Sequence, residues 1–225
     1  MILGIETSTR VCTVALHSEG ELIASQSYHL DKSHSSLLPG ILDQLLQNSG
    51  VEKSDLIAVS VSEGPGSYTG LRIGVSAAKG LAFGLDIPLI SIPTLYLIAG
   101  SLQGSMAPDT LAIPMIDARR MEVYASVYDH QMNCIRPVEP MIIDENSFSK
   151  YADYRLLLLG DGASKCEIIG HRSYQILDDI FPDARYMGKL AYQKFLDKSF
   201  EDVAYFEPLY LKQFQTKKAK NRLLD

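Results

Sequence analysis

The sequence predicts an α/β protein with two lobes, and three observations carry this prediction. Each half of the 225-residue chain opens with short β-branched or apolar runs of strand length, separated by turn residues. Helical patterns, with apolar residues three or four positions apart, follow in the first half. A stretch rich in small and turn-forming residues, 100–108, separates the halves. We therefore expect an N-terminal lobe at 1–104 and a shortened C-terminal lobe at 105–225.

The first half is expected to begin with three strands and to continue with alternating helices and strands. The predicted strands are 1–7, 11–18, 21–28, 56–62 and 88–92. The first helix follows from one apolar stripe, which consists of Leu38, Ile41, Leu42, Leu45 and Leu46. Pro39 should kink its first turn or delay its start. A second helix is expected at 68–85, and a short third helix should start at Thr94.

The second half is expected to repeat the order of elements of the first half in a shortened form. Strands are expected at 110–117, 123–128 and 156–160, with an extended segment at 132–143 and a helix at 186–200. Two lobes that open with antiparallel strands and then add β–α units indicate the fold shared by actin and the sugar kinases. Periodicity alone supports only a mixed α/β class.

Composition excludes several classes of protein. The formal net charge is -6, whereas a chain that held nucleic acid mainly through its phosphates would be basic. No apolar run reaches the roughly 20 residues that span a bilayer, and no basic leader precedes Glu6, so we expect neither a membrane span nor a signal peptide. Cys12, Cys134 and Cys166 are widely spaced, which favours a reducing cytoplasm over a disulfide framework.

Two short polar segments have alternative interpretations. At the end of the first strand, Glu6, Thr7, Ser8 and Thr9 form a tight hairpin whose hydroxyls and N–H groups can cradle phosphate, while the acid orients a metal-bound water. An ordinary serine–threonine turn is the alternative, and spacing alone favours it. The basic segment from Lys212 onward is either a solvated terminus or a docking arm for an anionic partner or RNA.

The most distinctive stretch is the glycine-rich run 64–74, which follows a strand and opens a helix. It matches neither a P-loop nor a dinucleotide-binding fingerprint. The helix then carries a stripe of mostly small residues, namely Gly70, Gly74, Ala77, Leu81 and Gly84. Each interior glycine costs a helix about 1 kcal/mol relative to alanine, so something must pack closely against the stripe. Either the protein's own sheet or a helix of another subunit fits, the latter with Arg72 and Lys79 at its border.

No catalytic metal or nucleophile motif occurs. The five histidines never stand at metal-ligand spacing, and no G-x-S-x-G nucleophile elbow is present. His34 precedes the first helix, where a lone histidine is more often a cap or a surface residue. The charged run 117–124 is of a kind that usually forms a solvated turn, but Asp117 ends an apolar strand, which favours a position at the cleft between the lobes. The loop 160–162 follows another predicted strand and is expected on the cleft side as well.

Four segments together resemble the TsaB family, also called YeaZ, along essentially the whole chain: 2–9, 64–74, 117–124 and 208–212. The resemblance implies a paralogue of TsaD, the subunit that transfers threonylcarbamoyl from its adenylate to tRNA. TsaD holds a metal with histidines on the helix after the fifth strand. Thr94 and Ile98 stand at the matching places here, and isoleucine cannot bind a metal. The resemblance therefore implies no catalytic residue, no metal and no cofactor, with 6–9 as a vestigial phosphate site.

The resemblance also implies partners. They are TsaD and the ATPase TsaE, with a homodimer in isolation, tRNA reached only through the complex, a cytoplasmic location and no membrane. The glycine-rich helix and its neighbour form the implied contact surface, through His34, Leu37, Ile41, Gly70, Arg72, Ile73, Gly74, Ala77, Lys79 and Leu81. Two alternatives stay open: an autonomous nucleotide-dependent phosphotransferase, which the fold suggests, and a glycoprotease-type metallopeptidase, against which the missing histidine pair argues.

Overall fold

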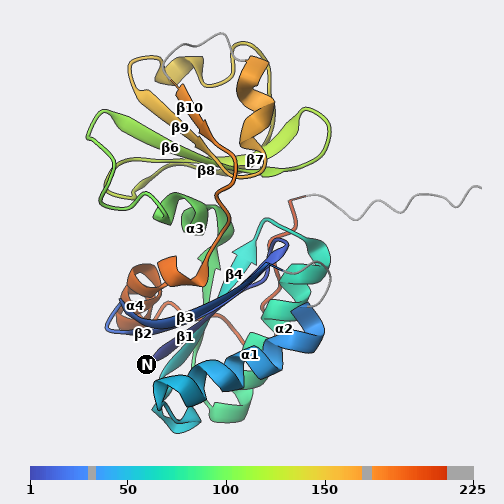
Figure 1. The fold of residues 1–225 in the computed structure, drawn as a ribbon, viewed down its shortest axis with the longest axis vertical. Helices are drawn as coiled ribbons and strands as arrows, with labels where there is room; N and C mark the ends of the chain where they lie inside the picture. The colour runs from blue at the N-terminus through green and yellow to red at the C-terminus, as the bar shows by residue number, and fades with distance from the viewer. Residues whose placement is uncertain (30–33, 169–173, 212–225) are drawn as a thin grey trace, which may run out of the picture.

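The computed structural model describes residues 1–29, 34–168 and 174–211, and it contains two five-stranded sheets, one in each lobe (Figure 1). The strands are β1 Ile2–Glu6, β2 Val11–Ser18, β3 Glu21–His29, β4 Ala58–Gly64, β5 Leu89–Pro93, β6 Thr110–Asp117, β7 Glu122–Tyr128, β8 Cys134–Ile142, β9 Arg155–Leu159 and β10 Tyr174–Leu177. The α-helices are α1 His34–Ser49, α2 Tyr68–Leu85, α3 Thr94–Gly100 and α4 Gly188–Leu196. Short 3-10 helices lie at Lys53–Asp55, Ser149–Tyr151, Ala163–Ile168 and Ala184–Tyr186.

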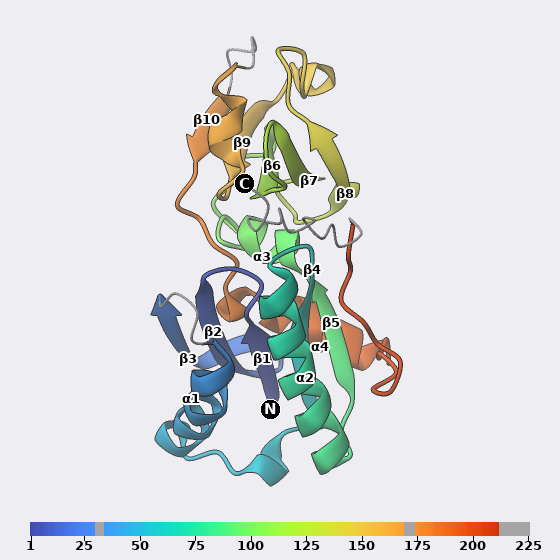
Figure 2. The same ribbon diagram turned by 90° about the vertical axis from the view of Figure 1, so that its right-hand side faces the viewer.

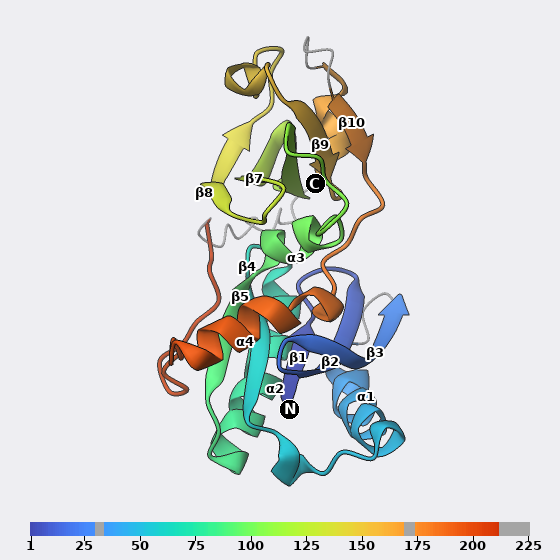
Figure 3. The same cartoon turned by 90° about the vertical axis from the view of Figure 1, so that its left-hand side faces the viewer.

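The first sheet has the strand order β3-β2-β1-β4-β5. β1 pairs antiparallel with β2 and parallel with β4. Helices α1 and α2 cover one face of this sheet and α4 covers the other (Figures 1 and 3). Because both faces are covered, β1 is buried along its whole length, which explains its nearly continuous apolar sequence.

Helix α2 has the bounds that the sequence predicts. Ser67 caps its start, since the Ser67 hydroxyl accepts a hydrogen bond from the Gly70 N–H at 3.2 Å. Asp86 ends it in the left-handed conformation, with φ of 54°. The face directed at the sheet consists of Gly70, Leu71, Gly74, Val75, Ala78 and Ala82, all buried. Two glycines of the stripe, Gly70 and Gly74, thus face the sheet together with four apolar residues of α2.

The second sheet has the order β10-β9-β6-β7-β8. It repeats the opening of the first sheet, because β6 pairs antiparallel with β7 and parallel with β9. The two mixed sheets confirm the predicted two-lobed α/β class with a reduced second lobe. Strand β10 was not predicted, since four residues of intermediate burial show no clear alternation of apolar and polar side chains.

Helix α3 lies between the two sheets, and all seven of its residues are buried (Figures 1 and 2). One apolar cluster runs through it and contains residues of both lobes, among them Ile92, Leu95, Ala112 and Leu159. The two lobes therefore share a continuous core at this point. Of the helices in the described part of the chain, none is long and apolar enough to cross a membrane.

After β10 the chain returns to the first lobe. The Ala184 N–H donates to Thr13 Oγ1 at 2.8 Å, and α4 packs on the first sheet opposite α1 and α2 (Figure 3). The predicted limits 1–104 and 105–225 follow chain order, whereas residues 184–211 lie against the first lobe. Helix α4 also stops at Leu196, before the predicted end at 200, and Lys198 there has a left-handed φ of 53°.

The segment 201–210, here named the C-terminal strap, runs along the open edge of β5. The Glu201 N–H donates to the Leu89 carbonyl at 2.9 Å, and Ser91 Oγ donates to Glu201 Oε1 at 2.6 Å. Further along, the Leu209 N–H donates to the Glu63 carbonyl at 2.7 Å. The strap thus contacts the edge strand β5 at Leu89 and Ser91 and the end of β4 at Glu63.

Two basic residues of α2 bind the strap from the helix side. Lys79 Nζ donates to the carbonyls of Ala204 and Phe206, at 3.0 and 3.2 Å. Arg72 Nε donates to the Tyr210 hydroxyl at 3.1 Å. Both side chains, which the sequence placed at the border of a subunit interface, therefore have contacts within their own chain.

We expect Lys79→Met to loosen the strap, because the substitution removes both hydrogen bonds to carbonyls and keeps the apolar stem. Hydrogen exchange measured by mass spectrometry should become faster for peptides covering 204–209. Lys189→Met changes an exposed lysine of α4 and should leave this exchange unchanged. Equal exchange in wild type and Lys79→Met would show that the lysine does not hold the strap.

Candidate functional site

The hairpin turn between β1 and β2 is enclosed by the glycine-rich loop of the same chain. Glu6, Thr7 and Ser8 are at most 1% exposed. Thr7 Oγ1 donates to the Gly70 carbonyl at 2.8 Å, and the Ser67 N–H donates to the Ser8 carbonyl at 2.6 Å. The turn and the start of α2 therefore form one hydrogen-bonded unit.

Close approach explains the glycines of this unit. A Cβ at Gly66 would lie 2.6 Å from the Ser8 carbonyl oxygen. A Cβ at Gly70 or Gly74 would collide with the carbonyl oxygen or the hydroxyl of Thr7. Contacts within the same chain therefore explain why a glycine stands at each of these positions. For Gly70 and Gly74 this agrees with the alternative in which the protein itself, rather than another subunit, packs against the helix.

The remaining small residues of α2 are placed differently. No atom lies within 4 Å of a Cβ built at Gly80 or Gly84, and the side chain of Phe83 is 83% exposed. Ala77 and Leu81 are half-buried on the same helix. The outer face of α2 therefore keeps glycines that no contact with the described residues explains.

The ten predicted partner-binding residues divide by exposure. Gly70, Gly74 and Ile41 are buried against other residues of the same chain, so they lie below the surface of the two helices. The exposed or half-buried members are Leu37, Arg72, Ile73, Ala77, Lys79 and Leu81. His34 starts α1, and its side chain lies outside the described residues. The basic segment 212–225 lies outside them as well.

The predicted phosphate cradle is not open in this conformation. The Ser8 N–H donates to Glu6 Oε1 at 2.5 Å, and Thr7 Oγ1 is engaged with Gly70. Thr9 Oγ1 accepts a bond from the Val11 N–H at 3.3 Å. These local side-chain contacts are those of an ordinary serine–threonine turn, the alternative that spacing favoured. Phosphate binding at 6–9 would require the glycine-rich loop to move.

Glu6 is the most strongly perturbed acid of the turn. Burial away from water raises the pKa of its carboxyl group from about 4.5 to about 7, although hydrogen bonds to the carboxylate oppose the change. Its Oε2 atom has no hydrogen-bond partner among the described residues. The carboxyl group is therefore fully buried, with one oxygen unpaired within the described part of the chain.

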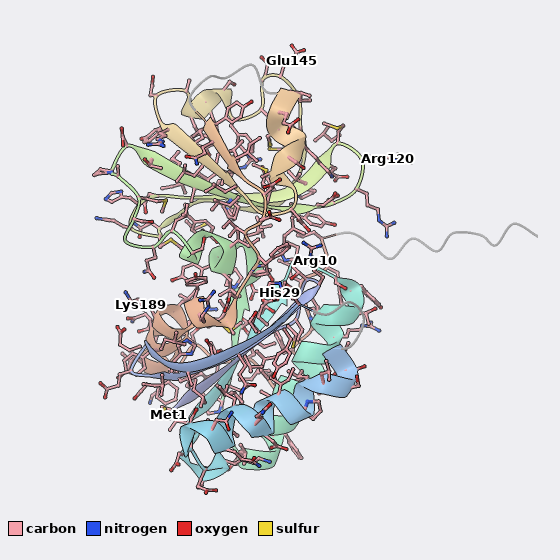
Figure 4. All side chains as sticks on the ribbon, viewed as in Figure 1. Met1, Arg10, His29, Arg120, Glu145 and Lys189 are labelled. Atoms are coloured by element: carbon pink, nitrogen blue, oxygen red, sulfur yellow. The ribbon has the colours of Figure 1, made fainter. Side chains whose placement is uncertain are left out.

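Charged side chains of the second hairpin, between β6 and β7, form hydrogen bonds within the protein. Asp117 Oδ1 accepts hydrogen bonds from the Arg119 N–H at 2.5 Å and from Lys165 Nζ at 2.6 Å. Asp161 Oδ1 accepts one from the Asp117 N–H at 2.9 Å. Arg120 extends away from the molecule at the tip of this hairpin (Figure 4). The charge cluster is thus an internally bonded turn, and no signal in the sequence pointed to Lys165.

Thr94 and Ile98, which the resemblance places at the metal-ligand positions of TsaD, lie on α3. Thr94 Oγ1 accepts a hydrogen bond from the Gly64 N–H at 3.1 Å, and Ile98 is 1% exposed in the core shared by the lobes. Among the described residues, no group of three or more histidine, cysteine, aspartate or glutamate side chains comes together at a place that could hold a metal.

Comparisons with known proteins identify the family. A family model described as "TsaD: tRNA N6-adenosine threonylcarbamoyltransferase" matches residues 21–153. The "tRNA threonylcarbamoyladenosine biosynthesis protein TsaB" of Bacillus subtilis (strain 168) is 34% identical over 84% of this chain and 80% of its own length. The Escherichia coli (strain K12) protein of the same name is 32% identical over 94% of both chains. The chain belongs to the TsaB family.

A solved TsaB-family structure has the same fold. "YeaZ from Pseudomonas aeruginosa" superposes with a TM-score of 0.83 at 25% identity, over 93% of this chain and 99% of that one. The family resemblance read from the sequence is confirmed. The match to the TsaD model also confirms that this TsaB chain is related to TsaD.

Gly74→Ala and Gly80→Ala should have opposite effects on stability. The first places a methyl group against the Thr7 hydroxyl and should lower the free energy of unfolding by about 1–3 kcal/mol. The second fills open space on a helix and should raise it by about 1 kcal/mol. Urea unfolding followed by circular dichroism measures both, and equal effects would show that Thr7 does not require the glycine.

Stability should depend on pH through Glu6. Its pKa is higher in the folded than in the unfolded protein, so the folded state is favoured most below about pH 4.5 and loses this advantage as the pH rises to about 7. Relative to Glu6→Gln, whose amide does not ionise, wild type should lose roughly 3 kcal/mol across this window. Glu145→Gln, which changes an exposed acid at the far end of the second lobe, should follow wild type (Figure 4). Parallel curves for wild type and Glu6→Gln would contradict the assignment.

Proposed function

We propose that this TsaB-family chain is a non-catalytic subunit that binds and activates TsaD, together with TsaE, in tRNA threonylcarbamoylation. The modified base is the adenosine adjacent to the anticodon. The observation that carries the proposal is the outer face of α2, where small residues lie over open space. Membership of a family whose curated relatives are named for threonylcarbamoyladenosine biosynthesis supports the pathway.

The outer face of α2 has the character of a helix-packing surface. Gly80 and Gly84 each cost the helix about 1 kcal/mol, and the described part of the chain offers nothing that packs on them. Ile73, Ala77 and Phe83 supply apolar surface around them. A partner helix could approach such a face closely, and its side chains would bury Phe83.

Helix α1 lies beside α2 on the same side of the first sheet, so the two helices present one continuous layer to a partner (Figure 2). Leu37 is half-buried near the start of α1, and Ile41 packs into the core behind it. A partner built on the same fold would offer a matching pair of helices. We propose that TsaD binds in this way and that a second copy of the chain takes its place in isolation.

The absence of a catalytic role is supported by the residues at the two places where chemistry is expected. Thr94 and Ile98 occupy the metal-ligand positions of TsaD, and both are buried in the core. At the hairpin that grips phosphate in related folds, Glu6 and Thr7 face inward. The acidic net charge supports an indirect contact with tRNA through the complex, in the cytoplasm.

Ala77→Glu and Gly80→Glu test the surface. Each places a carboxylate where a partner helix would bury it, and burying an unpaired charge is costly. We expect binding to TsaD to weaken at least about tenfold, which corresponds to about 1.4 kcal/mol, with loss of tRNA modification in the reconstituted mixture. Ser54→Glu, on an exposed 3-10 turn, is the matched control and should bind normally.

The reconstituted system also tests the proposal as a whole. TsaD, TsaE, tRNA and the threonylcarbamoyl-adenylate source should be inactive without this chain and active with it. TsaD activity that is unaffected by omission would refute an activating role. Turnover of a nucleotide by the isolated chain would instead support an autonomous phosphotransferase.

A further inference from the structure

The side of β8 that is directed at the first lobe is an apolar sheet face that the described residues leave partly uncovered. Val138, Pro140 and Ile142 alternate along the strand, so they share one side of it. Val138 and Tyr124, the β7 partner of Pro140, pack against the core that the two lobes share, which shows that this side is directed at the first lobe.

The exposure of this face rises toward the end of the strand. Val138 is half-buried and Pro140 is exposed. Ile142 is 72% exposed, and Met121, which precedes the β7 partner of Ile142, is 41% exposed. Helix α3 packs on the same side of the sheet against β6 and β7. We name the set of Met121, Val138, Pro140 and Ile142 the β8 face.

The described part of the chain ends close to this face. The Leu209 N–H donates to the Glu63 carbonyl at 2.7 Å, and a Cβ on Gly64 would lie 2.8 Å from the Leu209 carbonyl oxygen. Burial raises the pKa of Tyr128 on β7, and the charge of Glu63 adds to this effect, so this end of β4 lies near the second lobe. Figures 1 and 2 both show the upper end of the strap directly below the second sheet, and Figure 2 places it below β8.

The chain that follows the strap is long enough to reach the whole β8 face. Segment 212–225 spans at most roughly 45 Å when extended. Strand β8 has 9 residues and is therefore roughly 30 Å long. Because the segment is joined to the strap, its effective concentration at the face is on the order of millimolar, so even a weak contact is well populated.

The composition of segment 212–225 is complementary to the second lobe. The segment contains three large apolar residues, Phe214, Leu223 and Leu224, and five basic residues against one acidic residue. The second lobe, 105–183, contains 13 acidic residues against 7 basic ones. At the β8 face, Glu122 is half-buried opposite Ile142, and Asp144 and Glu145 are exposed just after the strand. Opposite charges at this spacing attract the segment, and apolar contact adds to the attraction.

We propose that segment 212–225 binds the β8 face of its own chain. Leu223 and Leu224 cover Ile142, and the basic residues before them lie near the acidic residues of the second lobe. The strap is held on the first lobe by Lys79 and Arg72, so the bound segment ties the first lobe to the second. This contact needs no other subunit, so the inference does not depend on the function proposed above.

The first experiment measures how fast trypsin cleaves the full chain after Lys217, Lys218, Lys220 and Arg222, followed by mass spectrometry. Ile142→Lys removes the most exposed apolar side chain of the face and adds a repelling charge. Cleavage should become at least about tenfold faster, because proteolysis follows the fraction of open segments. Ile142 is 72% exposed, so the substitution should leave the protein folded.

Ile168→Lys is the matched control for this experiment. Ile168 is 49% exposed and ends the 3-10 helix Ala163–Ile168, which packs on the opposite face of the second sheet. The same exchange of isoleucine for lysine changes the charge of the protein equally but leaves the β8 face intact. Its segment should be cleaved as slowly as that of wild type.

A photo-crosslink locates the contact. Benzoylphenylalanine in place of Ile142 should, on irradiation of the full chain, form a covalent link to a peptide from 212–225. Mixing the isotopically labelled and the unlabelled protein in equal amounts shows whether the link joins residues of one chain. In the variant with both Leu223→Ser and Leu224→Ser, the yield of this link should fall at least about tenfold, since the apolar contact is lost.

Three results would overturn the proposal. They are equal cleavage rates in wild type and Ile142→Lys, a crosslink that contains no residue of 212–225, and a crosslink that joins labelled to unlabelled chains. Capture of TsaD or of tRNA by the crosslinking residue, without a link to the segment, would assign the face to that partner instead. Failure of TsaD to bind would leave the crosslink within the chain unchanged, so the two proposals fail separately.

Discussion

The contact on which this structure depends most is that between Thr7 and the start of α2. The Thr7 hydroxyl donates to the Gly70 carbonyl, and the lack of side chains at Gly70 and Gly74 lets the hairpin approach the helix. This contact sets the position of α2 on the sheet, and therefore which residues of the helix face outward. It also encloses the hairpin turn at 6–9, for which the sequence offered phosphate binding as one interpretation. One close approach thus accounts both for the helix surface and for the inward direction of Glu6.

Much of the fold could be predicted from the sequence because local patterns decide it. The expected bounds of α2, 68–85, agree with the structure, in which Ser67 caps the start of the helix and Asp86 ends it. Strand β10 and the end of α4 could not be predicted, because long-range pairing with β9 and a left-handed residue at Lys198 determine them. The candidate site could be predicted only in part for the same reason. Spacing singled out the stripe that contains Gly70, Gly74 and Gly84, but only the fold separates the first two, which contact Thr7, from Gly84, which has no such contact among the described residues.

The two basic residues of α2 have hydrogen-bond partners within their own chain that the sequence does not indicate. Arg72 and Lys79 have the exposure and charge of interface residues in the sequence, yet they bind the strap through Tyr210 and the carbonyls of 204 and 206. Nothing local in either segment indicates this pairing, because more than a hundred positions separate them. Through Glu201 the same strap also contacts β5, at Leu89 and Ser91.

The return of residues 184–211 to the first lobe has a consequence for biosynthesis. As the nascent chain leaves the ribosome, β1 to β5 emerge first, but one face of their sheet stays bare until α4 has been made. The second lobe, β6 to β10, is contiguous in the chain and can complete its sheet earlier. The lobe that is translated first is therefore the last to close, and in the interval its apolar strands are exposed to aggregation or to chaperones.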